Sequence, residues 1–255
     1  ITKDQGTFRG LKSDYFLPEN IVSKDYPAML YEPIIPVVEE IQNSEYKYKP
    51  HIFSKIHIAS SQTACINLFI PILESQHADD ILKELTATPS NFDHIDRNEL
   101  FHGYRFEFWD STDDKDKGLL GDHSKQAGTD SDIAIAYRDK QGNLCLWLIE
   151  HKLTEKEFTE CGGYKSSKNE TKDICQSCSL SDILADSSLC YYHQVRKYNY
   201  WRIMSMDCVS DFFNGNFEGV GCPFRGGLNQ LWRNQLLAIS LEEQVPNKYK
   251  EVYFS

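Results

Sequence analysis

Two apolar runs separated by a short polar turn form the clearest pattern in the chain. The first run covers residues 133–137, the second covers residues 144–149, and the turn Lys140-Gln141-Gly142-Asn143 lies between them. Apolar runs on either side of a glycine-containing turn predict a β-hairpin. The second run is apolar at nearly every position, which is typical of a strand buried on both faces. Because a hairpin brings its outer ends together, we expect residues near 132 to lie beside residues near 150.

The register of this hairpin decides which charged side chains share a face. With an odd-length loop, or with a bulge at Gly142, Asp132 lies opposite Glu150 or Lys152, and the three side chains share one face because side chains alternate along a strand. A plain two-residue loop would instead place Asp132 opposite His151. A shared face therefore requires the odd loop or the bulge.

Helical spacing of apolar residues precedes the hairpin. It covers residues 26–43, where two prolines interrupt it, and it returns after Ser60 or Ser61, either of which can cap a helix. We expect this second helix to run to the residue before Pro71, where the proline ends or kinks it. The helical region extends over residues 77–85.

The remaining elements complete a mixed architecture. Residues 103–109 alternate aromatic and polar side chains, which predicts a first strand leading into the hairpin. Residues 191–206 and 227–243 have the spacing of helices, and a strand from residue 249 closes the chain. Together these elements predict an α/β fold with a mixed β-sheet flanked by helices.

Charged residues gather at the outer ends of the hairpin. Asp130 and Asp132 precede its first strand, and Glu150 and Lys152 follow its second. Carboxylates at a strand end suit a hard divalent cation, Mg²⁺ or Mn²⁺, whose bound water can attack phosphorus. We expect Asp132 and Glu150 to hold the ion, Asp130 to be an alternative ligand, and Lys152 to orient or deprotonate the water. The alternative is an exposed hairpin with solvated charges, but charges at the end of an apolar strand favour a site.

This arrangement resembles the PD-(D/E)XK nuclease superfamily, with Asp132 as the first acid and Glu150-His151-Lys152 as the Glu-x-Lys element. The chain also resembles a restriction-endonuclease-like family with a cysteine-rich insertion. The blocks that carry this resemblance are SSQTACINLF (60–69), GTDSD (128–132), LWLIEHKLTEKEF (146–158), CGGYKS (161–166) and CPFRGGLNQLWRNQLLA (222–238). The resemblance implies a restriction-endonuclease-like core, Mg²⁺-dependent deoxyribonuclease activity and DNA as the partner.

Two residues of the predicted helix 191–206 are further candidates. Gln194 and Tyr198 resemble the Gln-x3-Tyr element of RecB-like nucleases, and on a continuous helix they share a face. We take Gln194 as catalytic and Tyr198 as a contact to the substrate. The alternative is that the tyrosines of this segment only pack.

Other polar residues of the resembling blocks have open roles. Arg225 and Arg233 suit contacts to phosphate or base edges, although they suit a buried polar network as well. No Glu stands early in the helix after residue 60, so the third carboxylate of the site is unassigned. Gln62 is a candidate for a neutral ligand or a water-positioning group, and Glu107 on the first strand is another group that could face the site.

Cysteines carry a second signal. Four of them form a C-x13-C-x2-C-x11-C pattern in a segment poor in core residues: Cys161, Cys175, Cys178 and Cys190. In a reducing compartment such a pattern is more often a metal site than a pair of disulfides. It predicts structural Zn²⁺ or an iron–sulfur cluster, with free thiols as the alternative, and Cys222 could replace one of the four. The remaining cysteines have apolar neighbours typical of a core: Cys65, Cys145 and Cys208.

Length and composition set the outer limits. A chain of 255 residues that is 40% hydrophobic can bury a full core, which we divide into an N-terminal helical extension (1–57) and a nuclease-like domain (58–255) with a cysteine-rich insertion at about 159–190. No apolar stretch approaches a membrane span, and the start lacks a signal peptide, so we expect a cytoplasmic protein without membrane contact. Because the first residue is Ile1 and the segment 249–255 has the pattern of a strand cut at its edge, we expect a piece of a larger multidomain protein. A homodimer is the other assembly that we consider.

A net charge of −11 argues against a surface coated for nucleic-acid binding. Part of the acid is local to residues 110–122, however, and lysines follow the hairpin, so a basic strip beside an acidic metal site stays compatible with the sequence. We therefore predict a metal-dependent DNA endonuclease of restriction, defence or repair. Two alternatives remain: a catalytically inactive module that binds nucleic acid or protein on the same fold, and a redox-sensing cysteine element on another scaffold.

Overall fold

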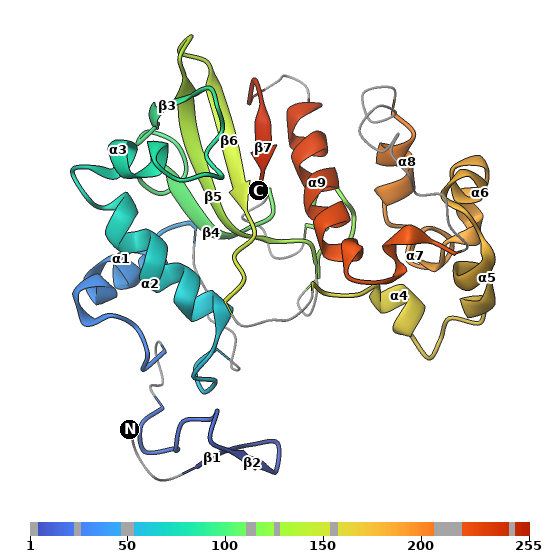
Figure 1. Cartoon of the computed structure of the whole chain (residues 1–255), viewed down its shortest axis with the longest axis horizontal. Helices are drawn as coiled ribbons and strands as arrows, with labels where there is room; N and C mark the ends of the chain where they lie inside the picture. The colour runs from blue at the N-terminus through green and yellow to red at the C-terminus, as the bar shows by residue number, and fades with distance from the viewer. Residues whose placement is uncertain are drawn as a thin grey trace. The chain divides into compact units, whose positions relative to one another are not determined.

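In the computed structural model, the chain divides into two compact units (Figure 1). Unit 1 comprises residues 1–108, 131–155 and 255, and unit 2 comprises residues 109–130 and 156–254. Both are discontinuous in sequence, because the predicted first strand and the hairpin are separated by a segment of unit 2. The structure describes residues 5–22, 27–46, 54–110, 116–124, 128–153, 158–206, 221–244 and 248–255.

A mixed sheet of five strands is built around β5 (Ser131–Asp139). On one side β5 pairs antiparallel with β6 (Leu144–Ile149), and on the other it pairs antiparallel with β4 (Tyr104–Phe108) and then with β3 (Phe92–Ile95). The fifth strand, β7 (Val252–Phe254), follows β6 in the strand order. Ser255 donates to the carbonyl of Leu148 and accepts from the N–H of Glu150, the pattern of a parallel pair. The predicted mixed sheet is confirmed, although β3 is a strand that the sequence pattern did not predict.

The hairpin of β5 and β6 has the predicted odd loop. Arg138 is the last residue of β5 paired with β6, opposite Leu144, and Asp139 donates its N–H to the carbonyl of Asn143 at 3.0 Å. Residues 140–142 form the loop between them, and Gly142 has a φ of +84°, which a residue without Cβ adopts at little cost. The register that places Asp132 opposite Glu150 is therefore confirmed.

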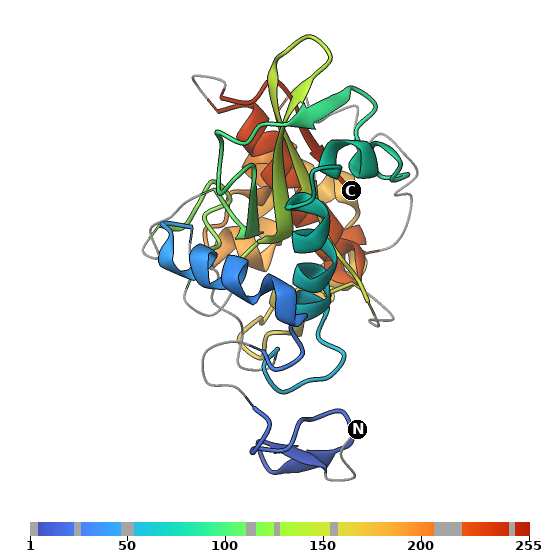
Figure 2. The same cartoon turned by 90° about the vertical axis from the view of Figure 1, so that its left-hand side faces the viewer.

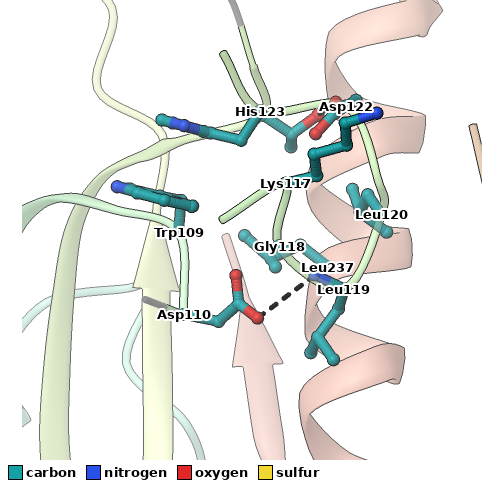
Figure 3. A pocket seen from close by; sticks show the side chains of 10 residues that line it. Trp109, Asp110, Lys117, Gly118, Leu119, Leu120, Asp122, His123 and Leu237 are labelled. Carbon is teal, nitrogen blue, oxygen red and sulfur yellow. Dashed lines mark hydrogen bonds between the residues drawn. The ribbon is translucent and has the colours of Figure 1, made fainter. Parts of the chain in front are cut away.

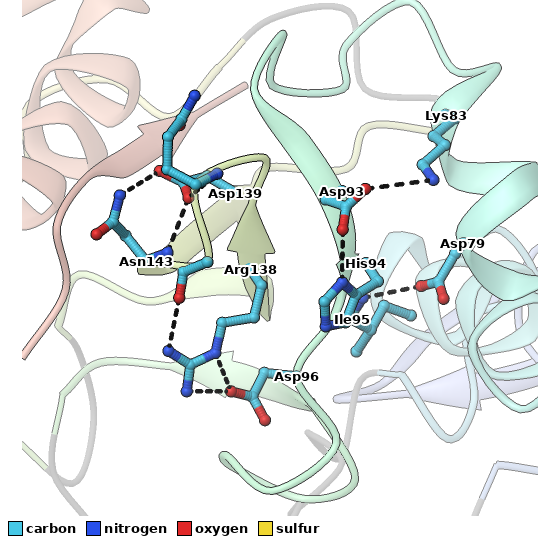
Figure 4. A network of polar contacts seen from close by, with 11 residues as sticks. Asp79, Lys83, Asp93, His94, Ile95, Asp96, Arg138, Asp139 and Asn143 are labelled. Atoms are coloured by element: carbon cyan, nitrogen blue, oxygen red, sulfur yellow. Dashed lines mark hydrogen bonds and ion pairs between the residues drawn. The ribbon is translucent and has the colours of Figure 1, made fainter.

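Polar contacts fix this turn and the neighbouring strand (Figure 4). The carboxylate of Asp139 accepts from the backbone N–H groups of Gln141 and Asn143 and from the Asn143 side chain, which holds the pKa of Asp139 below its ordinary value. Arg138 donates to Asp96, just after β3, at 2.7 Å and to the carbonyl of Gly142 at 3.1 Å. These bonds tie β3 to the hairpin turn through a single arginine.

Helices α1 and α2 lie against one face of the sheet in unit 1 (Figures 1 and 2). Helix α2 (Ser61–Leu73) begins where predicted, because the Ser60 hydroxyl accepts the Thr63 N–H. Of the two outcomes expected at Pro71, an end of the helix is wrong: α2 continues to Leu73, which is fully buried in the core and holds the last turn in place.

Short elements complete unit 1. Helix α1 (Ile35–Asn43) follows a 3-10 turn (Glu32–Ile34), and α3 (Ala78–Lys83) packs beside β3. Residues 1–57, which we expected as a helical extension, hold in their described part both α1 and a small antiparallel hairpin of β1 (Gly6–Phe8) and β2 (Leu11–Ser13).

Unit 2 is mainly helical. Its helices are α4 (Gly162–Lys165), α5 (Lys172–Ser177), α6 (Leu180–Ala185), α7 (Tyr191–Gln194), α8 (Tyr200–Met204) and α9 (Leu228–Glu242), with 3-10 turns at Ser187–Leu189 and Pro223–Arg225. The predicted final helix is confirmed as α9. A continuous helix over 191–206 is wrong: α7 ends at Gln194, and Lys197 has a φ of +61°, which no helix accommodates.

An aromatic cluster forms much of the core of unit 2. Trp232 of α9 lies with its ring centroid 4.2 Å from Phe224, 5.1 Å from Trp201 and 5.2 Å from Tyr200. Each of these four side chains is almost fully buried. No helix in the described part of either unit is long and apolar enough to cross a membrane.

Candidate functional site

Three carboxylates lie in one row across the sheet of unit 1. The residues on either side of Glu107 in β4 pair with those on either side of Asp132 in β5, so these two acids are opposite each other. The register of β5 with β6 continues from Ile133 opposite Ile149 to Asp132 opposite Glu150. Neighbouring strands lie about 4.8 Å apart, so a row across three strands brings its side chains together.

Each carboxylate of this row accepts a hydrogen bond from a protein donor. Lys152 Nζ donates to Glu150 at 2.6 Å, and the backbone N–H of His151 donates to Asp132 at 2.6 Å. Gln62 Nε2 donates to Glu107 at 2.8 Å. The Glu150 side chain is only 3% exposed whereas Lys152 is 25% exposed, so the lysine forms the solvent side of the pair.

Glu107, which the sequence marked as a group that could face the site, lies in this row. It has a φ of +50°, a left-handed conformation that is costly for a residue with a side chain inside a strand. Strain of this kind is concentrated at functional sites because the surroundings must hold it in place. Gln62, considered above as a neutral ligand or water-positioning group, donates its amide to Glu107, and its predicted role stays a prediction. The alternation of residues 104–108 was the only sequence signal for this position.

Helix α2 presents Gln62 and Cys65 to the same row. Burial raises the pKa of the Cys65 thiol well above its ordinary value, and the negative charges of Asp132, Glu107 and Glu150 raise it further. All three acids are therefore close to one buried side chain, which stays a neutral thiol. The ring of His151 packs at right angles to Phe69 of the same helix, with centroids 6.4 Å apart.

The donor set of this row fits a hard divalent cation. Carboxylate oxygens are the ligands that Mg²⁺ and Mn²⁺ prefer. In the residues that the structure describes, no group of three or more Cys, His, Asp or Glu side chains is arranged as a finished metal site.

Asp130, which we expected as an alternative ligand of the ion, belongs to unit 2. Its carboxylate is 2.7 Å from His123 Nε2, and the His123 ring stacks on Trp109 with centroids 3.5 Å apart. Trp109 and His123 line a shallow pocket together with Asp110, Lys117 and other residues (Figure 3). Its interior leaves essentially no enclosed space for a water-sized molecule, so it is not a ligand cavity. The role of Asp130 as a metal ligand stays a prediction.

Arg233 takes part in a buried polar network of unit 2. Its guanidinium donates to the carbonyl of Gly128 and to the Thr129 hydroxyl, both at 3.2 Å, and lies 3.8 Å from Asp122. Tyr200 donates its hydroxyl to Asp122 at 2.6 Å. Burial raises the pKa of Tyr200, and the charge of Asp122 raises it further, so the hydroxyl keeps its proton. Of the two interpretations of Arg233, these contacts favour the buried network.

The other predicted substrate contacts also have partners within unit 2. Arg225 donates to the carbonyl of Gln176 at 3.4 Å, and Tyr198 accepts from Arg196 at 3.3 Å. Gln194 is the last residue of α7, so it does not share a continuous helix with Tyr198. Their contacts to a substrate remain predictions.

The described cysteines are all free thiols. Cys65 and Cys145 are buried in the core of unit 1, as expected, whereas Cys208 lies outside the described residues. The predicted metal set of Cys161, Cys175, Cys178 and Cys190 lies in unit 2 with Cys222.

Comparisons with known proteins identify the chain. A model of the family described as restriction endonuclease associating with ARP matches residues 3–254. No curated protein and no solved structure matches the chain. Because the match covers almost the whole chain, the protein belongs to the family of restriction endonucleases associating with ARP.

Proposed function

We propose that the protein is a metal-dependent nuclease that hydrolyses phosphodiester bonds of DNA, in restriction, defence or repair. The observation that carries this proposal is the row of Glu107, Asp132 and Glu150 across three strands, with Lys152 bonded to Glu150. The family to which the chain belongs is described as one of restriction endonucleases, which supports DNA as the substrate.

Asp132 and Glu150 are the proposed ligands of Mg²⁺ or Mn²⁺, and Glu107 is the proposed third carboxylate. A bound ion would supply a water of lowered pKa and offset charge on the phosphate. Gln62 orients Glu107 by its 2.8 Å hydrogen bond, so it is a positioning residue in this scheme. The Cys65 thiol, whose pKa is raised by burial and by the charges of the three acids, stays neutral and adds no fourth negative charge.

Lys152 is the proposed group that acts on the attacking water. Its ammonium lies on the solvent side of a nearly buried carboxylate, where a phosphate group can approach it. In that position the lysine can orient the water or stabilise charge on the phosphorane. As a neutral amine, after loss of one proton, it can also accept a proton from the water.

The net charge of −11 favours a second candidate, a catalytically inactive binding module on the same fold. The two functions differ in turnover. We expect the wild-type chain to cut supercoiled plasmid DNA in Mg²⁺ or Mn²⁺ and to lose this activity in EDTA, because the carboxylate row alone supplies no activated water. Gel mobility with the same DNA in EDTA provides the comparison. Binding without cutting in either metal would favour the inactive module.

We also propose that the cysteine-rich segment at 159–190 is held together by a structural metal, either Zn²⁺ or an iron–sulfur cluster. The segment contains α4, α5 and α6, each of four to six residues. Helices this short are marginal in isolation and depend on tertiary contacts. A thiolate-bound metal would supply such contacts.

A further inference from the structure

One stretch of unit 2 is positively charged, although the chain as a whole has a net charge of −11. Residues 187–206 contain Arg196, Lys197 and Arg202 and no Asp or Glu, whereas the full sequence holds 38 acidic residues against 27 Lys and Arg. Arg196 and Lys197 are exposed in the loop between α7 and α8, residues 195–199, which we call the basic loop. A local positive charge of this kind attracts a negatively charged polymer even on an acidic protein.

The two cations of the basic loop are not used in ion pairs of the described residues. Such pairs within unit 2 join other side chains: Lys165 with Glu160, His123 with Asp130, and Arg233 with Asp122. Asp186, the last acid before the stretch, accepts the N–H of Ser188 at 3.0 Å and so ends the preceding 3-10 turn. The charges of Arg196 and Lys197 are therefore available to a partner.

The guanidinium of Arg196 is held against an aromatic ring. Its Cζ lies 5.7 Å from the ring centroid of Tyr198, and its Nε donates to the Tyr198 hydroxyl at 3.3 Å. The Tyr198 ring in turn packs 5.1 Å from Tyr192 and 5.4 Å from Tyr200, which is almost fully buried. A planar guanidinium that is already ordered loses less freedom when it binds a phosphate group.

The backbone of the basic loop is strained at Lys197. Its φ of +61° lies in the left-handed region, which is costly for a residue with a long side chain. Hydrogen bonds hold the following residues in place: Tyr198 donates its N–H to the carbonyl of Tyr192 at 3.1 Å, and Asn199 donates to the carbonyls of Leu119 and Leu120, both at 2.9 Å. A lysine at a position that would suit glycine better indicates that its charge has a function.

We propose that the basic loop binds the phosphate backbone of duplex DNA through Arg196 and Lys197. The choice of DNA as the partner rests on the proposed nuclease function. The guanidinium of Arg196 matches two phosphate oxygens, and the ammonium of Lys197 supplies a point charge beside it. Contacts to phosphate hold a duplex without reading its sequence, so this loop contributes affinity and orientation to an otherwise acidic protein.

The salt dependence of DNA binding by the full chain tests this proposal. Fluorescence anisotropy with a labelled duplex in EDTA measures affinity while no metal is present for cleavage. Each phosphate contact contributes about 0.9 to the slope of log K against log salt concentration, so Arg196→Ala and Lys197→Ala should each reduce that slope by about 1. Both variants should weaken binding to two duplexes of unrelated sequence by the same factor.

Two further variants separate loss of contact from loss of folding. Lys197→Gly removes the same charge, but glycine adopts a positive φ without strain. We expect this variant to unfold at a higher urea concentration than wild type and yet to bind DNA with the reduced slope. Lys140→Ala removes an exposed lysine of unit 1 and should bind DNA as wild type does.

Three results would overturn the proposal: wild type that binds no duplex DNA, an unchanged slope in both Arg196→Ala and Lys197→Gly, or an equal change in Lys140→Ala. Cleavage in Mg²⁺ is measured separately and tests the nuclease proposal. A chain that binds DNA through the basic loop but never cuts it would support this inference and contradict the nuclease. A chain that cuts DNA while the variants bind normally would do the reverse.

Discussion

Replacing Lys152 with alanine should lower the rate of DNA cleavage by about 10²- to 10⁴-fold, the range typical of a group that transfers a proton in the transition state. The ammonium is 2.6 Å from Glu150, whose side chain is almost inaccessible to solvent. Its loss removes both the group that acts on the water and the cation that pairs with Glu150. Single-turnover cleavage of a linear DNA in Mg²⁺ measures the effect.

Lys140→Ala is the matched control for this substitution. Lys140 is exposed in the turn of the same hairpin, at the opposite end from the carboxylates, and donates to the carbonyl of Ser90. The Lys140→Ala substitution changes the net charge by the same amount as Lys152→Ala. The Lys140→Ala variant should cleave DNA at the wild-type rate. Near-ultraviolet circular dichroism should show both variants folded. Full activity of Lys152→Ala, or an equal loss in Lys140→Ala, would contradict the assignment of the lysine.

Asp122→Ala should lower the free energy of unfolding of unit 2 by about 3 kcal/mol, because removal of one member of a buried ion pair leaves the other charge uncompensated. Asp122 is 5% exposed and receives the Tyr200 hydroxyl, and Arg233 lies 3.8 Å away. Urea unfolding followed by tryptophan fluorescence reports mainly this unit, which holds three of the four tryptophans, Trp109, Trp201 and Trp232.

Tyr200→Phe separates the hydrogen bond from the charge. It removes one hydroxyl and leaves the ring in the aromatic cluster, so it should cost about 1 kcal/mol. The charge of Asp122 opposite Arg233 is retained. If Asp122→Ala unfolds at the same urea concentration as wild type, or if Tyr200→Phe is the more damaging change, the ion pair does not stabilise the unit.

Local sequence signals were sufficient for the hairpin and for the start of α2. Gly142 permits the left-handed residue that an odd loop requires, and the loop length then determines that Asp132 lies opposite Glu150. Ser60 caps α2 by a bond to a residue three positions later. In both cases the determining contacts lie within a few residues of each other, so the sequence alone indicates them.

Features that depend on distant contacts were either absent from the sequence prediction, as β3 was, or left open by it, as the place of Glu107 was. β3 has only four residues and is held by pairing with β5 and by the Arg138–Asp96 bonds. The register of β4 with β5 places Glu107 opposite Asp132, and the register of β5 with β6 places Asp132 opposite Glu150. Glu107 lies beside the other two acids only because both registers hold. Its strained φ depends on surroundings that no local pattern specifies.

Two expectations about helices failed for related reasons. Pro71 was expected to end or kink α2, and it does not end the helix, because the missing N–H affects only the last turn, which burial of Leu73 stabilises. The segment after Gln194 has helical composition, yet Lys197 adopts a left-handed conformation and Asn199 bonds to the backbone of Leu119 and Leu120. Tertiary contacts outweighed helix propensity in both places.

Cleavage of supercoiled DNA by wild type and by Asp132→Asn, in Mg²⁺, in Mn²⁺ and in EDTA, tests the central claim most directly. This substitution keeps the size of the side chain and an oxygen that can accept the backbone N–H of His151, but it removes the charge at the centre of the row. We expect wild type to cut in either metal and not in EDTA, and the variant to be inactive throughout while unfolding at the wild-type urea concentration. Metal-dependent cutting by Asp132→Asn at the wild-type rate would show that the carboxylate row is not the active site.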